Sequence, residues 1–214
     1  MNTTRTEMFR GCLIASISHA IMTNIYPDLS YEQSWDGVNY SIQNTAGLRG
    51  TITFDMDYCV GAIRNERSDL IFDNKFIQRI TRKFPLEIID KAYEETLQYL
   101  LVEREGIAVP CVTSMFWADA STIHYQEENV DNLKKDLILF SKILLPEDAA
   151  ISEWKAYYDM DSSAISLLRH LYHKKIKCFA AKIELNREQK SLIPGDVINR
   201  ECIEALKELN IYCE

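Results

Sequence analysis

The sequence predicts an α+β fold with an N-terminal helix, an antiparallel β-meander over about residues 38–72, and a mainly helical remainder packed on the sheet. Apolar residues near the N-terminus recur at three- and four-residue steps, which indicates a helix. Three segments rich in β-branched and aromatic residues then follow at short spacing, which indicates strands. Helical periodicity returns in the second half of the chain, so helices follow the sheet.

The first helix is expected over residues 6–25. It ends before Pro27, because the residue that precedes a proline disfavours helical geometry. Thr3, Thr4 or Thr6 can cap its first turn. The apolar positions that form one side of this helix are Phe9, Leu13, Ile14, Ile17, Ala20 and Ile21.

The expected strands of the meander occupy residues 38–43, 48–54 and 58–65, and only "NTAG" and "DMD" separate them. Parallel neighbours need a crossover of a dozen or more residues, so strands this close must pair antiparallel. The segment 70–72 can extend the meander. A further strand or extended segment is expected at 107–117, where Pro110 excludes the middle of a central strand.

Helices are expected in five further segments, at residues 74–84, 85–105, 129–145, 161–175 and 196–210. The segment 85–105 combines an apolar stripe with an acidic outer side, which is typical of a surface helix. Asp161 or Ser162 can cap the fourth segment, and Asp196 can cap the fifth. The segment 177–185 fits either a strand or a helical continuation.

The chain has 214 residues, of which 47% are hydrophobic, and it contains only 7 Gly and 5 Pro. These numbers suit a packed core and leave no flexible linker, so one compact domain over residues 1–214 is expected. If this domain subdivides, the sequence favours a sheet-containing part at 1–117 and a mainly helical part at 118–214.

The formal charge of −8 is spread over both halves of the chain, without a basic tail. Nucleic-acid binding draws most of its affinity from basic side chains, so no nucleic-acid partner is expected. No segment reaches the roughly 18 to 20 apolar residues that span a bilayer, and the N-terminus lacks the layout of a signal peptide. We therefore expect a cytoplasmic protein without membrane association, whose protein partner, if it has one, is basic.

Six cysteines stand at positions 12, 59, 111, 178, 202 and 213, without a Cys-x-x-Cys motif. Most of them lie inside apolar runs, as in "GCLIAS" and "KCFAAK". This placement is typical of reduced, buried thiols rather than of disulfides or metal ligands.

Asp55 and Asp57 follow directly on an apolar strand in "TITFDMDYCV". An Asp-x-Asp pair in such a place can bind a divalent cation or supply the nucleophile and acid of a phosphatase. However, the preceding strand alternates apolar and polar residues, whereas a buried parallel strand is apolar on both faces. The next strand also begins at once, which leaves no helix to form a phosphate pocket. The sequence therefore favours a hairpin corner, with a metal or catalytic role as the alternative.

Two histidines have a functional and a structural interpretation. His19 lies near the apolar face of the first helix, and this favours a hydrogen-bonded core residue over a general base. His124 could bind a metal together with Glu127 and Glu128. A polar loop before a helix explains the same residues, since acids are favourable at the positive end of a helix.

The segment between Arg169 and Lys182 is basic, with five Lys or Arg residues, two His and no acid. His170 and His173 lie about one helical turn apart in it, but no glutamate between them completes a zinc motif. Surface or internal ion pairing is therefore expected, ahead of contact with an anion or partner and ahead of a metal.

Two aromatic clusters and one acidic helix side provide the candidate binding surface. Aromatic residues with polar neighbours, as at residues 30–43 and 114–119, are typical of recognition surfaces. The alternative is that these rings cover the sheet. The candidate binding residues are Trp35, Asp36, Tyr40, Glu94, Glu95 and Trp117.

The chain contains no nucleophile elbow, no P-loop and no dinucleotide-binding glycine motif, so no cofactor is expected. In size, charge and lack of catalytic signatures, it resembles small acidic bacterial cytosolic proteins that neutralise toxins by binding them. Our first hypothesis is a non-enzymatic protein-binding module, immunity-like or inhibitory, that acts through an acidic or aromatic surface. The alternatives are a divalent-metal-dependent phosphoryl- or glycosyl-transfer enzyme using Asp55 and Asp57, and a structural subunit of a homo-oligomer whose sheet edges pair.

Overall fold

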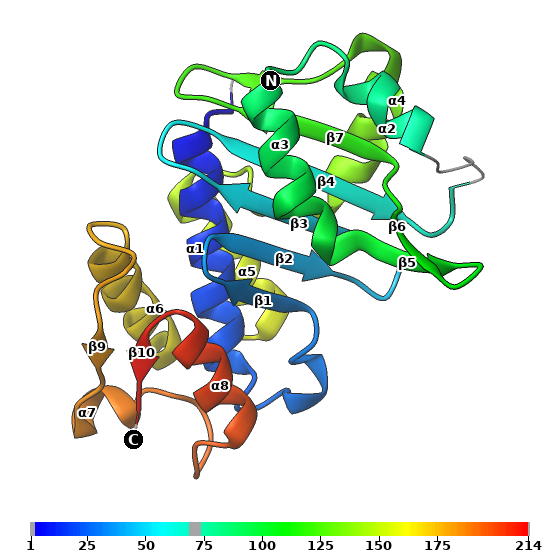
Figure 1. Ribbon diagram of the computed structural model, residues 1–214. Coiled ribbons are helices and arrows are strands. Elements are labelled where there is room, and N and C mark those ends of the chain that lie inside the picture. The colour runs from blue at the N-terminus through cyan, green and yellow to red at the C-terminus, as the bar shows by residue number, and fades with distance from the viewer. Residues whose placement is uncertain (1–2, 69–73, 214) are drawn as a thin grey trace. The chain divides into compact units, whose positions relative to one another are not determined.

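The structure, a computed structural model, describes residues 3–68 and 74–213. It confirms the α+β class, with an N-terminal helix, an antiparallel sheet and a mostly helical remainder (Figure 1). The segment 70–72, which was expected to extend the meander, lies outside the described residues.

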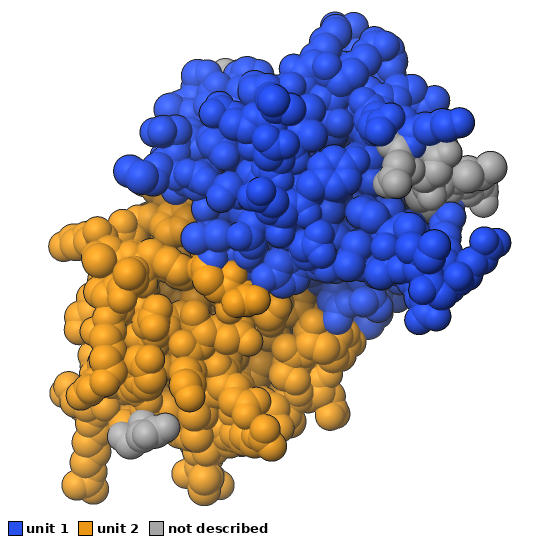
Figure 2. Space-filling view, viewed as in Figure 1, with its two compact units in different colours: residues 1–6, 38–141 blue, residues 7–37, 142–214 orange. Residues whose placement is uncertain are grey.

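The chain divides into two compact units (Figure 2). Unit 1 contains residues 1–6 and 38–141, and unit 2 contains residues 7–37 and 142–214. This division does not follow the expected boundary after residue 117, which falls inside a strand of unit 1. The first helix therefore groups with the C-terminal segment rather than with the sheet that follows it in sequence.

The sheet of unit 1 is antiparallel and includes the expected meander. Its strands are, in order of pairing, β2 (Asn39–Gln43), β3 (Leu48–Phe54), β4 (Cys59–Asn65), β7 (Ser114–Ala118) and β8 (Ile123–His124). The three expected strands agree with β2, β3 and β4 to within one residue. The strands could be predicted this closely because short connections allow only one strand direction and little freedom of register.

Both faces of this sheet are covered. One face packs against α2 (Asn74–Thr81), α3 (Leu86–Glu94) and the 3₁₀ helix η2 (Thr96–Leu100), around buried apolar residues such as Val60 and Met115. Figure 1 shows α3 lying across β3 and β4. The other face meets Phe140, whose ring packs edge-on against Phe116. On the polar side of β3, Thr51 and Thr53 are therefore interior, whereas Arg49 is exposed.

Hydrogen bonds among three buried side chains and the half-buried Glu95 satisfy polar groups on this side of β3. The Thr53 hydroxyl donates to Asn39 Oδ1 at 2.6 Å and lies 2.7 Å from the Thr96 hydroxyl. Because the Thr53 proton is used on Asn39, Thr96 must donate the second bond. Asn39 Nδ2 in turn donates to Glu95 Oε2 at 2.9 Å. We call Asn39, Thr53, Glu95 and Thr96 the buried polar row.

The prediction of one helix over 85–105 is wrong. The helix α3 ends at Glu94, η2 follows, and β5 (Leu101–Arg104) then pairs with β6 (Ile107–Pro110) in a separate hairpin. The buried polar row holds the chain at the start of η2. Glu105 and Gly106 have φ of 53° and 79° and close the two-residue turn of the hairpin, as such turns require.

Other predicted helices differ mainly at their ends. The segment 129–145 contains α4 (Val130–Asp136) and the 3₁₀ helix η4 (Leu137–Phe140), preceded by η3 (Glu127–Asn129). The last helix, α8 (Arg200–Glu208), is capped by Asn199, whose Oδ1 accepts from Cys202 N at 2.8 Å, and not by Asp196. The expected cap at Asp161 is present, because its Oδ1 accepts from Ala164 N at 2.8 Å.

Unit 2 is mainly helical. Its elements are most of α1 (Arg5–Met22), η1 (Pro27–Leu29), β1 (Gln33–Asp36), α5 (Glu147–Tyr158), α6 (Ser162–Lys175), β9 (Ile183–Glu184), α7 (Arg187–Lys190), α8 and β10 (Ile211–Tyr212), and β9 and β10 pair in parallel. The helix α1 is buried on nearly all sides, including Ser16 and Ser18, which donate to carbonyl oxygens one turn back. Within the described part of the chain, no helix combines the length and apolar composition that crossing a membrane requires.

Gly61 of β4 lies directly opposite Phe116 of β7, so Gly61→Ala should destabilise unit 1. An added Cβ would lie 2.1 Å from Phe116 Cζ. We expect the free energy of unfolding to fall by about 1–3 kcal/mol, as for overpacked cores, measured by urea denaturation. The double variant Gly61→Ala/Phe116→Leu should lose less than the two single variants together. Strict additivity would contradict this contact.

All six cysteines are free in the structure, and every one except Cys178 is buried. A thiol reductant should therefore leave the melting temperature unchanged. Loss of a disulfide costs about 2–5 kcal/mol, so a drop of several degrees on adding reductant would contradict this prediction.

Candidate functional site

Asp55 and Asp57 lie in the tight turn that connects β3 to β4. The turn closes through Asp55 N, which donates to Tyr58 O at 2.8 Å. The Asp55 carboxylate accepts from Met56 N at 2.7 Å, whereas Asp57 is exposed. The hairpin that the sequence favours at this position is therefore present.

A salt bridge joins this turn to α3. Lys91 Nζ lies 3.1 Å from Asp55 Oδ2, and Arg5 Nε donates to the Asp55 carbonyl at 2.8 Å. The bond from Met56 N, followed by the bond from Lys91, holds the pKa of Asp55 below its ordinary value. Asp55 is thus ionised at neutral pH, and its carboxylate is paired with Lys91 of the same unit.

Three further carboxylates line the outer side of α3. Glu87, Asp90 and Glu94 are exposed, and they form no ion pair or side-chain hydrogen bond with any other described residue. Tyr58 lies between the turn and the helix. Its pKa is raised first by burial and then by the negative charges of Asp55, Glu87 and Glu94.

The structure therefore brings two sequence-predicted regions together, the Asp55–Asp57 turn and the acidic side of the helix that carries Glu94. We call Asp55, Asp57, Glu87, Asp90 and Glu94 the acidic surface. Lys91 and Tyr58, which connect its two parts, were not identified from the sequence. No local pattern signals them, because the contact between Lys91 and Asp55 spans 36 positions of the chain.

Glu95 does not belong to the acidic surface. Its carboxylate accepts from Asn39 in the buried polar row, and the residue ends α3 with φ of −124°. The expectation that Glu94 and Glu95 form one outer acidic pair is therefore corrected for Glu95. Reversing its charge would remove the partly buried hydrogen bond with Asn39 and would not test binding alone.

Trp35 and Tyr40 lie in the interior, with 3% and 0% of their surface exposed. Within unit 2, the Trp35 ring packs against Phe9 and Phe179, and its indole N–H donates to the Gly37 carbonyl at 2.9 Å. Both rings therefore pack in the interior and are not exposed for binding. Asp36 is exposed, so its role in binding stays a prediction.

Trp117 takes part in a compact polar cluster near β8. Its ring stacks on His124, with 3.9 Å between centroids, and His124 Nε2 lies 2.9 Å from Asp119 Oδ2. Hydrogen bonds from Ser121, then from Thr122 N and His124, hold the pKa of Asp119 far below its ordinary value. These contacts fix the orientation of the imidazole ring.

The glutamates that could bind a metal together with His124 do not contact it in the structure. Glu128 forms an ion pair with Arg82. Asp119, rather than Glu127 or Glu128, is the acid that contacts His124. Among residues 3–68 and 74–213, no group of three or more His, Cys, Asp and Glu side chains is arranged to hold a metal ion.

His19 is a hydrogen-bonded residue of the core, as the sequence favours. Its Nδ1 lies 2.9 Å from the Tyr158 hydroxyl, and its Nε2 lies 3.4 Å from the Ser30 carbonyl oxygen. Burial lowers the pKa of His19 to about 4, so the ring is neutral at physiological pH.

The basic segment pairs within unit 2. Arg169 contacts Asp148 at 2.9 Å, and Lys182 contacts Glu184 at 2.8 Å. Lys175 is fully buried and donates to the carbonyl oxygens of the segment that follows α6. Three basic residues of this segment, Arg169, Lys175 and Lys182, thus form ion pairs or hydrogen bonds within unit 2.

Asp55 and Asp57 should differ in their contribution to stability. Asp55→Ala removes the Lys91 salt bridge and the acceptor for Met56 N, so we expect a loss of about 1–2 kcal/mol after allowing for solvent screening. Asp57→Ala, the matched control, should change the free energy of unfolding by less than about 0.5 kcal/mol. Urea denaturation measures both.

The Asp55 effect should also depend on pH. The folded-state pKa is lowered, so the stabilisation is present above the unfolded-state pKa and is lost as pH falls through the folded-state value. Wild type and Asp55→Ala should therefore converge in acid. Equal effects of the two alanine variants, or a gap that widens below pH 4, would contradict the role of this salt bridge.

The acidic surface combines the Asp55–Asp57 turn with the outer side of α3. Its carboxylates are presented from a turn and a helix side that the Asp55–Lys91 bridge holds together. No family model, curated protein or solved structure matches the chain.

Proposed function

We propose that the protein is a cytoplasmic, non-enzymatic protein-binding module, inhibitory or toxin-neutralising, that contacts a basic partner through the acidic surface. One observation carries this proposal. Five carboxylates come from two segments of unit 1 that the Asp55–Lys91 salt bridge joins, and four of them form no ion pair with a described residue.

The charge of this surface suits recognition. Exposed charges of one sign steer a partner of opposite sign and select against partners of like sign, mainly through the association rate. The whole chain adds to this attraction with its formal charge of −8.

Apolar contact area is also available at both parts of the surface. Met56, between the two aspartates, is 87% exposed, and Leu86, at the start of α3, is 72% exposed. A methionine adapts its shape to different partners, and buried apolar contacts supply affinity that rim charges do not. Acidic groups beside exposed apolar side chains thus supply both components of a protein interface.

The alternative functions receive less support. In a metal-dependent enzyme that uses Asp55 and Asp57, the Asp55 carboxylate would have to exchange Lys91 for the metal. No observation on the described residues favours a homo-oligomeric structural subunit over binding of another protein.

The charge-reversal variant Asp90→Lys/Glu94→Lys tests the proposal. Both changes suit the helix, because lysine has a higher helix propensity than aspartate and is favourable near a helix C-terminus. We therefore expect an unchanged melting temperature. Proteins captured from host-cell lysate by the wild type should be lost from this variant, and the purified partner should bind at least tenfold more weakly.

Glu153→Lys/Glu188→Lys is the matched control, since both residues are exposed acids in unit 2. It makes the same change in net charge away from the acidic surface and should retain the partner. Binding of the wild type should weaken as salt rises, and the Asp90/Glu94 variant should show a smaller dependence. Equal binding by both variants, or catalytic turnover abolished by a chelator, would overturn the proposal.

A further inference from the structure

Two aromatic rings of unit 2 face the ammonium group of Lys142. Its Nζ lies 4.3 Å from the centroid of the Tyr157 ring and 5.1 Å from that of the Trp154 ring. Both distances are within the roughly 6 Å over which an aromatic face attracts a cation. The two rings stand at 88° to each other, with 5.6 Å between their centroids. They therefore form two perpendicular walls around one cation, and we call this pair of rings the aromatic cage.

The fold holds both walls of the aromatic cage in place. Trp154 and Tyr157 lie three positions apart in α5, so they project from the same side of that helix. Trp154 is only 4% exposed and stacks on Tyr158, with 5.8 Å between centroids. Tyr157 is 45% exposed, and its hydroxyl donates to the Glu32 carboxylate at 2.9 Å. One wall is thus fixed in the core, and the other is open to solvent.

The Glu32 carboxylate adds a negative charge beside the aromatic cage. Burial raises the pKa of Glu32, whereas the bond from Tyr157 and the positive charge of Lys142 lower it. Burial also raises the pKa of Tyr157 to about 12, so its hydroxyl keeps the proton that it donates to Glu32. A cation between the two rings therefore meets two aromatic faces and the field of a carboxylate.

Lys142 itself fits the aromatic cage incompletely. An ammonium group has three N–H donors and is strongly hydrated, but no residue in the described part of the chain accepts a hydrogen bond from Nζ. A trimethylammonium group carries no N–H and needs no acceptor, yet aromatic faces attract it in the same way. The aromatic cage therefore suits a methylated ammonium group better than it suits Lys142.

The Trp154 side chain is also incompletely satisfied. Its indole N–H is buried and has no acceptor among residues 3–68 and 74–213. Buried donors in folded proteins are nearly always paired. The chain thus supplies an incomplete set of partners to the ring over which Lys142 lies.

From this geometry we infer that the aromatic cage is a binding site for the methylated ammonium group of a ligand, and that Lys142 fills the site when the ligand is absent. Lys142 is half-buried on a flexible stem, so it can exchange its place for water. An internal occupant weakens ligand binding in proportion to the time for which it fills the site. The site shares no residue with the acidic surface, so the failure of either proposal leaves the other intact.

Calorimetric titration with tetramethylammonium chloride tests the inference. Lys142→Ala removes the internal occupant and should lower the dissociation constant by about tenfold or more. Adding Tyr157→Leu to this variant removes one wall at a solvent-exposed position and should abolish the gain, with the melting temperature as the check on folding. Equal dissociation constants for the wild type and Lys142→Ala would overturn the inference.

Lys182→Ala is the matched control, because Lys182 Nζ lies 4.8 Å from the centroid of a single ring of the same unit, that of Tyr212. It makes the same change in net charge and should bind tetramethylammonium like the wild type. A gain equal to that of Lys142→Ala would show a general effect of charge and would contradict the role of the aromatic cage. Ammonium chloride, whose cation carries four N–H groups, should bind Lys142→Ala at least tenfold more weakly than tetramethylammonium.

Choline and Nε-trimethyl-lysine distinguish two sources of the methylated ammonium group. Tighter binding of choline to Lys142→Ala indicates a small molecule, and tighter binding of trimethyl-lysine indicates a modified side chain of another protein. Binding of neither would overturn the inference.

An NMR titration of the wild-type chain locates the site without any substitution. Tetramethylammonium should shift the indole signal of Trp154 and leave that of Trp117, which stacks on His124, unchanged. A shift of the Trp117 signal alone would place the cation in unit 1 and would contradict the assignment to the aromatic cage.

Discussion

The arrangement of unit 1 depends on the buried polar row, in which Asn39, Thr53, Glu95 and Thr96 satisfy one another on the sheet. A buried polar group without a partner costs about 1–3 kcal/mol, so Asn39, Thr53 and Thr96, which are buried, need their partners at the same time. Thr96 and Glu95 directly follow α3, and their bonds therefore set where that helix ends and how it lies on β3 and β4. With α3 fixed in this way, Lys91 reaches Asp55, and the turn and the helix present their carboxylates as one surface.

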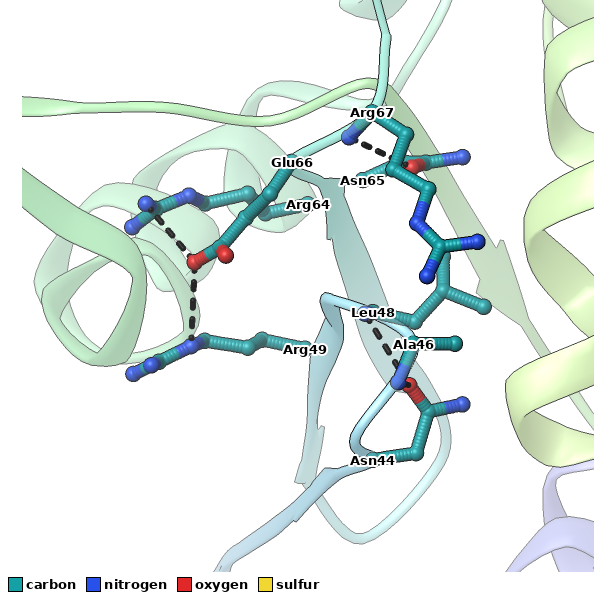
Figure 3. Close-up of polar contacts among 8 residues, drawn as sticks. All are labelled: Asn44, Ala46, Leu48, Arg49, Arg64, Asn65, Glu66 and Arg67. Carbon is teal, nitrogen blue, oxygen red and sulfur yellow. Dashed lines mark hydrogen bonds and ion pairs between the residues drawn. The ribbon is translucent and has the colours of Figure 1, made fainter.

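The β3–β4 hairpin carries acidic residues at one end and basic residues at the other. Asp55 and Asp57 lie at the closed end, and Arg49 and Arg64 pair near the open end (Figure 3). Phe54 lies five positions along the strand from Arg49, which corresponds to about 17 Å. The screening length at physiological ionic strength is about 8 Å, so each end keeps its own potential.

The strands of the meander were predictable because short connections and alternating patterns are local properties. Once β3 and β4 are joined by four residues, their register follows, so the Arg49–Arg64 pair was recoverable from the sequence. The end of α3 at Glu94 was not predictable from the sequence. The apolar stripe of the segment 85–105 continues past Thr96, the residue that bonds to Thr53. A bond between residues 43 positions apart overrides the local preference. The Lys91–Asp55 bridge has the same origin and was equally hidden.

The end of α3 shows how one stretch of sequence serves both stability and surface chemistry. Glu94 and Glu95 are adjacent and chemically identical, yet one faces solvent and the other accepts a hydrogen bond from Asn39. The helix ends between them, so the following backbone turns the second carboxylate inward. Charges on the solvent side, such as Asp90 and Glu94, can change without disturbing the buried polar row, since they share no contact with it. Residues of the acidic surface can therefore change while the fold of unit 1 stays the same, which is the separation of roles that the proposed protein-binding function requires.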